Sequence, residues 1–196
     1  MRSDKRKEMD MRYWTVQTKQ VMEQVMSEGK YFPDFAYSEH TKGNEMMQEL
    51  YGILLDSFNR ANNVQFPGLI FTFMKSEGRY IMPIENDKEF YALIQQKQSA
   101  IKGLWNYFKK RDMVIVELEF QEDINPIYID INDFQAIMPP VFAVPPYTRE
   151  EITRIYMNLD QGIVETSIFP SGIIQAHLPY IFKEHVVNVY ELFELR

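Results

Sequence analysis

The stretch from residue 114 to residue 120 constrains the fold most, because its side chains follow a two-residue period. Its apolar side chains and their neighbours alternate: Val114, Val116, Leu118 and Phe120 stand between Ile115, Glu117 and Glu119. Successive side chains of a β-strand point to opposite faces of the sheet, so this period predicts a strand with one buried face. Such a strand needs partner strands elsewhere in the chain.

Other short apolar runs, bounded by turn residues, predict those partners. A first hairpin is predicted for residues 68–74 and 79–84, on either side of the turn Ser76-Glu77-Gly78. Two more strands are predicted at residues 163–169 and 173–178, on either side of the turn Pro170-Ser171-Gly172. Further strands are predicted over residues 12–16, 126–131, as a partner strand, and 185–193.

Apolar residues at helical spacing follow several capping residues. Thr18 is a predicted N-cap for a helix ending at Gly29, Asn44 for a helix to about residue 62, and Asn86 or Asp87 for a helix to residue 111. Thr148 and Glu151 have the spacing of a capping box at the start of a fourth helix. Helices thus concentrate in the N-terminal half and strands in the second half, which predicts an α+β fold with a mainly antiparallel sheet.

Length and composition predict a single domain and a cytoplasmic location. The chain has 196 residues, 45% of them hydrophobic, which suffices for one core over residues 11–196, whereas residues 1–10 are charged and predict a disordered extension. The absence of cysteine excludes a disulfide scaffold and a thiolate metal site. No apolar run is long enough for a membrane span, and a net charge of −7 makes nucleic acid an unfavourable partner.

Motifs for metals and common cofactors are missing from the sequence. The histidines are His40, His177 and His185, and their spacing matches no metal motif. Glycine-rich dinucleotide and phosphate-binding motifs do not occur either. The segment 130–133 lacks the glycine and the terminal glutamate of a calcium loop, so we interpret it as a turn in which Asp side chains bind local backbone. No metal and no resident cofactor are predicted.

Both ends of the chain place polar side chains among apolar ones. The first predicted strand carries Trp14, Thr15 and Gln17, and the late strand carries Gln175 and His177. A buried amide needs hydrogen-bond partners, so the two glutamines are expected to share one polar cleft between these strands. Trp14, Thr15, Gln17 and Gln175 are therefore the predicted ligand-binding residues.

The same two ends resemble an uncharacterised bacterial and phage family defined only as a domain of unknown function. The resemblance rests on residues 13–17 (YWTVQ) with Gly29 and on residues 175–181 (QAHLPYI) with 184–187 (EHVV), and it covers the chain from Met11 onward. It implies common ancestry and no particular chemistry.

A more distant resemblance is to ADP-ribosyltransferase-like folds. In these folds a first strand contacts the nicotinamide ribose and a late strand presents a catalytic glutamate; here Tyr13-Trp14-Thr15 and Gln175 stand at those places. An amide at position 175 lacks the charge that steadies an oxocarbenium-like centre. Glu165, on the predicted strand before it, is the nearby acidic substitute, and a solvent-facing role is its simpler interpretation.

Two functional hypotheses follow. In the first, the chain is a binding or interaction protein that keeps the cleft without the catalysis, with NAD, a related nucleotide or a protein as its partner. In the second, it is an NAD- or nucleotide-processing enzyme in which Glu165 or Gln175 positions the ribose and His177 assists proton transfer. The changed motif residues favour the first.

Overall fold

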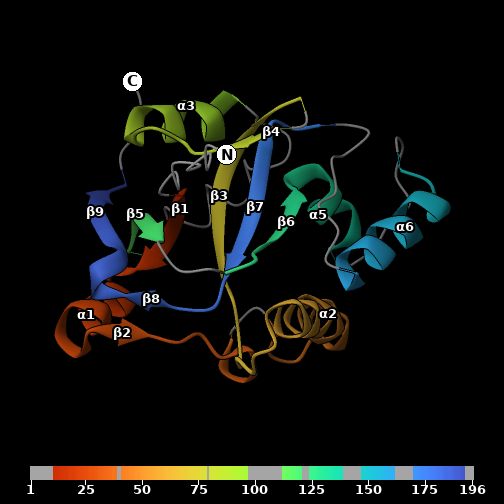
Figure 1. The fold of residues 1–196 in the computed structure, drawn as a ribbon, viewed down its shortest axis with the longest axis horizontal. Coiled ribbons are helices and arrows are strands. Elements are labelled where there is room, and N and C mark those ends of the chain that lie inside the picture. Colours follow the sequence, from red (N-terminus) through yellow and green to blue (C-terminus); the bar gives the residue numbers. More distant parts are fainter. Residues whose placement is uncertain are drawn as a thin grey trace, which may run out of the picture.

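A computed structural model describes residues 11–38, 41–78, 80–96, 112–120, 124–138, 147–161 and 170–192. These residues form an α+β fold built on one seven-stranded sheet, with helices packed around it (Figure 1). The predicted extension at residues 1–10 and the predicted strand at 163–169, which carries Glu165, lie outside the described residues. The predicted helix of residues 87–111 is described only as far as Gln96.

Every described strand pair in this sheet is antiparallel, which confirms the predicted sheet type. The main strand order is β6-β7-β3-β1-β5-β9, and β4 pairs with β3. The bounds are β1 Met11–Thr18, β3 Ile70–Glu77, β4 Tyr80–Met82, β5 Met113–Phe120, β6 Ile127–Asp130, β7 Ile173–Leu178 and β9 Val186–Glu191.

Described helices occur in both halves of the chain. They are α1 Lys19–Glu28, α2 Glu45–Asn62, α3 Asp87–Gln96, α5 Ile131–Ile137 and α6 Arg149–Asp160, with short 3-10 helices η1 Phe35–Tyr37 and η2 Lys183–His185. None of the helices in the described ranges is long and apolar enough to cross a membrane.

The predicted helix caps are in place. The Thr18 side chain accepts a hydrogen bond from the Val21 amide and the Asn44 side chain accepts one from the Met47 amide, so each satisfies an amide that the first helical turn leaves unpaired. Thr148 and Glu151 form the predicted capping box. Gly29 ends α1 with a φ of 83°, a conformation that favours glycine.

The sheet has two faces, named here after neighbouring residues of β1. On the Trp14 face, α3 packs beside Trp14 and Phe73 at one end, whereas α2, α5 and α6 cover β6 and its neighbours at the other. On the Tyr13 face, α1 packs through Met22 and Val25. Figure 1 shows α1 at the lower left and α2, α5 and α6 together on the right. Buried polar residues occur on both faces, among them Thr15 on the Tyr13 face and Gln175 on the Trp14 face.

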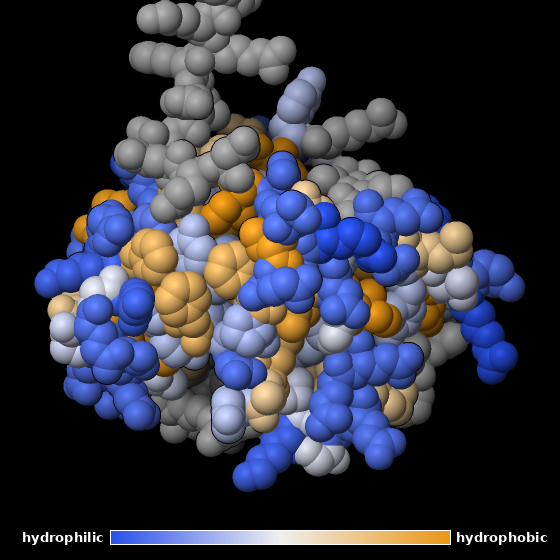
Figure 2. All heavy atoms as spheres, turned by 60° about the horizontal axis from the view of Figure 1, so that its bottom comes forward, coloured by the Kyte–Doolittle hydropathy of each residue, from blue (hydrophilic) through white to orange (hydrophobic). Residues whose placement is uncertain are grey.

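Strands β2, Lys30–Tyr31, and β8, Ile181–Phe182, form a second small sheet that the sequence does not predict. Aromatic rings support it: Phe32 lies 5.7 Å from Tyr180 and 5.8 Å from Phe182, and Tyr180 and Phe182 stack at 4.3 Å. Phe32 is 41% exposed. Figure 2 shows the side of the molecule that carries α1, β2 and α2, where apolar residues lie in separate areas among hydrophilic ones.

Two predictions for the middle of the chain need correction. The strand predicted at 126–131 as a partner strand is not the partner of β5, because β6 pairs with β7 at the opposite edge of the sheet. The segment 130–133 is not a simple turn, since it begins α5, although the Asp130 side chain does bind local backbone by accepting from the Asn132 amide. Helix α5 follows β6 directly and packs on β7, where Phe134 lies 6.4 Å from His177.

Alanine substitutions at two glycines test this packing, because we expect one to lower and the other to raise the free energy of unfolding. A Cβ atom at Gly68 would lie 2.7 Å from the Pro33 carbonyl oxygen, whereas one at Gly52, inside α2, meets nothing within 4 Å. We expect Gly68→Ala to lower the free energy of unfolding by about 1–3 kcal/mol through overpacking. Gly52→Ala should raise it by about 0.5–1 kcal/mol, because alanine favours a helix. Urea denaturation measures both, and changes of equal sign would contradict the described packing.

Candidate functional site

The four predicted ligand-binding residues do not share a cleft. Trp14 pairs with Phe73, and Phe73 pairs with Gln175, so these three side chains lie on one face of the sheet. Gln17 is three residues after Trp14 in the same strand and therefore points to the Tyr13 face, as does Thr15. The prediction that Gln17 and Gln175 line one polar cleft is wrong, because the register of β1, β3 and β7 puts them on opposite faces.

Thr15 and Gln17 hold the sheet together. The Gln17 amide donates to the Thr15 hydroxyl at 2.9 Å, and that hydroxyl donates to the Phe71 carbonyl oxygen on the neighbouring strand at 2.8 Å. Thr15 is fully buried. Their polar groups thus bridge β1 to β3, and this role accounts for their position without a ligand.

Trp14 is a core residue. Its side chain is fully buried and lies between Phe90, whose ring is 5.4 Å away, and Tyr190, whose ring is 5.6 Å away. The indole Nε1 donates to the Ile84 carbonyl oxygen at 2.8 Å. With both ring faces covered and its only donor paired, Trp14 offers no surface to a ligand in this conformation.

Gln175 and His177 do lie together, on the Trp14 face of β7. Both are buried, and His177 is packed against Phe71, 4.6 Å away, and Phe134, 6.4 Å away. Complete burial lowers the pKa of His177 from 6.5 to about 4, although a hydrogen bond to the Ile127 carbonyl oxygen opposes this shift. The imidazole is therefore neutral near pH 7 and enclosed, and it does not reach a solvent-accessible substrate.

Glu117 is a buried carboxylate, although the two-residue period of its strand predicts that it belongs to the less buried set. It pairs opposite Trp14 and is 4% exposed. Arg12 lies 3.1 Å from one carboxylate oxygen, and the Tyr190 hydroxyl donates to the other at 3.0 Å. Arg12 is the sequence feature that could have indicated this burial, because its side chain on the first strand is a counter-ion for a carboxylate on the neighbouring strand. Both carboxylate oxygens are paired, so the cluster joins β1, β5 and β9.

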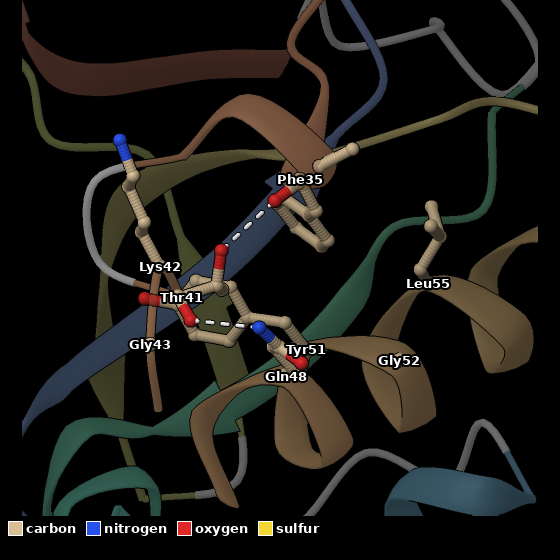
Figure 3. Close-up of a pocket in the computed structure, with 9 residues that line it drawn as sticks. Phe35, Thr41, Lys42, Gly43, Gln48, Tyr51, Gly52 and Leu55 are labelled. Atoms are coloured by element: carbon tan, nitrogen blue, oxygen red, sulfur yellow. Dashed lines mark hydrogen bonds between the residues drawn. The ribbon is translucent and has the colours of Figure 1, made fainter. Parts of the chain in front are cut away.

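An open pocket lies between η1, residues 41–43 and α2. Its cavity volume is about 430 Å³, within the usual range for small-molecule sites. Figure 3 shows Phe35 from η1 and Gln48, Tyr51 and Leu55 from α2 around it. Sequence reasoning missed this pocket, because no motif marks it and its walls come from segments with ordinary capping and helix signals.

The pocket combines an aromatic wall with a polar rim. Phe35 and Tyr51 have ring centroids 4.9 Å apart, and Leu55 extends the apolar surface. At the rim, the Thr41 hydroxyl donates to the Phe35 carbonyl oxygen and the Gln48 amide donates to the Thr41 carbonyl oxygen, which fixes the loop (Figure 3). Lys42 is exposed beside them and adds a positive charge.

Comparisons with known proteins leave the site to be argued from its geometry. No protein-family model, curated protein or solved structure matches the chain. Within the part of the chain that the structure describes, no group of three or more histidine, aspartate or glutamate residues could hold a metal ion.

Proposed function

We propose that the protein binds a small ligand and that the pocket between η1 and α2 is the binding site. One observation carries this proposal: Gly52 stands inside α2 on the pocket wall. A glycine in a helix interior costs about 1 kcal/mol relative to alanine, and no neighbour would obstruct a side chain at this position. A side chain at position 52 would occupy the open space of the pocket. A ligand that needs this space would explain why the helix has glycine here despite its cost in stability.

The lining indicates the class of ligand. Phe35 and Tyr51 supply aromatic surface for a planar ring, and Lys42 supplies a cation for an anionic group. Gln48 and the backbone at Gly43 add polar contacts. A nucleotide combines a planar base with phosphate, so NAD, ADP-ribose or a mononucleotide fits this chemistry, and the chain is then a binding protein.

The described residues favour binding over catalysis. The nine residues that line the pocket include no carboxylate, histidine or cysteine. Of the three catalytic candidates, Gln175 and His177 are enclosed, and Glu165 lies outside the described residues. The resemblances to the family of unknown function and to ADP-ribosyltransferase-like folds stay predictions, since no comparison tests them.

A thermal-shift screen tests the binding proposal. NAD, ADP-ribose and mononucleotides are added separately to the wild type, Gly52→Ala and Gly52→Leu. A ligand at a hundredfold excess over its Kd should stabilise the wild type by about 2.7 kcal/mol. Leucine at position 52 should fill the pocket and abolish this shift, whereas alanine, an equally good helix former, should retain most of it. No shift with any nucleotide would contradict the proposal and favour a protein partner.

The enzyme hypothesis has its own test. We expect neither the wild type nor Gln175→Glu to release nicotinamide from NAD, because position 175 is buried on a face closed by packed side chains. Chromatographic measurement of free nicotinamide, against a heat-inactivated sample, detects turnover. Release above that control would show that the chain is an NAD-consuming enzyme.

A further inference from the structure

Two buried polar atoms on β7 have no hydrogen-bond partner among the described residues. They are Oε1 of Gln175 and Nε2 of His177. The two residues are 3% and 0% exposed. An unpaired buried polar atom costs about 1–3 kcal/mol, so two of them on one strand require an explanation.

The two side chains lie on the same face of β7. Gln175 and His177 are two residues apart in one strand, so their side chains point to the same face and their Cα atoms are about 7 Å apart. The opposite strand β6 presents Ile129 beside Gln175 and Ile127 beside His177, so the flanking side chains on that side are apolar. A small bridging group between them would therefore be enclosed.

The tautomer of His177 determines what that group must be. Nδ1 lies 3.1 Å from the Ile127 carbonyl oxygen, which can only accept, so Nδ1 carries the proton. Burial keeps the imidazole neutral at pH 7, because its pKa is lowered to about 4. Nε2 is then an acceptor, and Oε1 of Gln175 is an acceptor as well. Two acceptors cannot satisfy each other; they need one donor with two protons.

We propose that Gln175 and His177 hold one buried water molecule, which donates one proton to Oε1 and the other to Nε2. Water is the common small donor of two hydrogen bonds, and buried waters usually satisfy such groups. This site is independent of the pocket at α2, and the water would satisfy the buried amide oxygen and the buried imidazole nitrogen at once.

Nuclear magnetic resonance on the full chain tests both parts of the proposal. Imidazole ¹⁵N shifts should show a protonated Nδ1 and an unprotonated Nε2 for His177 at pH 7. Magnetisation transfer should also connect the His177 ring protons to a water molecule that exchanges slowly with the solvent. Gln175→Met, which keeps the volume and removes the acceptor, should abolish this water signal but leave the Nδ1 tautomer unchanged.

Other results would overturn the proposal. A protonated Nε2 would show that His177 is a donor there. Loss of the water signal from the wild type, together with a direct coupling between the Gln175 amide protons and Nε2, would show that the amide is rotated and donates to the imidazole itself. If Gln175→Met does not fold, the wild type alone decides: absence of a slowly exchanging water beside the His177 ring overturns the proposal.

Discussion

Lowering the pH from 7 to 4 should reduce the free energy of unfolding by about 3 kcal/mol through His177 alone. The unfolded chain binds a proton at this residue near pH 6.5, whereas the folded chain does so only near pH 4. Between these values the unfolded state holds more protons, so stability is fully present above about pH 6.5 and is lost as the pH falls towards 4. Urea denaturation at several pH values gives the slope.

His177→Gln is the matched control, because glutamine can donate to the Ile127 carbonyl oxygen and does not titrate. The difference in stability between wild type and variant should change with pH only between about 4 and 6.5. Asp130, whose pKa is raised chiefly by burial, contributes in the opposite direction at acid pH, but it is present in both proteins and cancels in this difference. Parallel pH profiles would mean that His177 is accessible to protons in the folded state.

Trp14→Ala should lower the free energy of unfolding by about 3–5 kcal/mol, the usual cost of removing a large buried aromatic side chain. The substitution removes the stacking with Phe90 and Tyr190 and leaves the Ile84 carbonyl oxygen without its donor. Trp14→Phe keeps part of the packing and should cost less. Urea denaturation of both variants measures this.

Gln17→Ala is the control for Trp14→Ala, and the two losses in the free energy of unfolding are compared. Its side chain is partly exposed and donates one hydrogen bond, to Thr15, so we expect a loss of about 1 kcal/mol or less. A Trp14→Ala variant with nearly wild-type stability would show that position 14 is not a core position and would restore it as a candidate for ligand binding.

Local features of this fold could be predicted from the sequence because their signals are local. Thr18, Asn44 and the Thr148–Glu151 pair cap the helices as expected, since a cap depends on three or four consecutive residues. The strand at 113–120 follows its two-residue period. Pairing is different: β6 joins β7 from more than 40 residues away, and nothing within β6 distinguishes that partner from β5.

The candidate cleft failed for a related reason. Strand period alone separates Trp14 from Thr15 and Gln17, because neighbours in a strand point to opposite faces. Whether Gln175 joins one set or the other depends on the register across two strand pairs, and a slip by one residue would reverse the answer. The burial of Glu117 likewise depends on Arg12 and Tyr190 from other strands. These relations belong to the tertiary structure.

Amide chemical-shift mapping tests most directly whether a nucleotide-type ligand binds the pocket between η1 and α2, as proposed. On titration with the nucleotide that gives the largest thermal shift, we expect the amide signals of Lys42, Gly43 and Gly52 to move with saturable behaviour, while those of Trp14 and Gln175 stay in place. Saturable shifts centred on β1 and β7, with the α2 signals unchanged, would contradict the account.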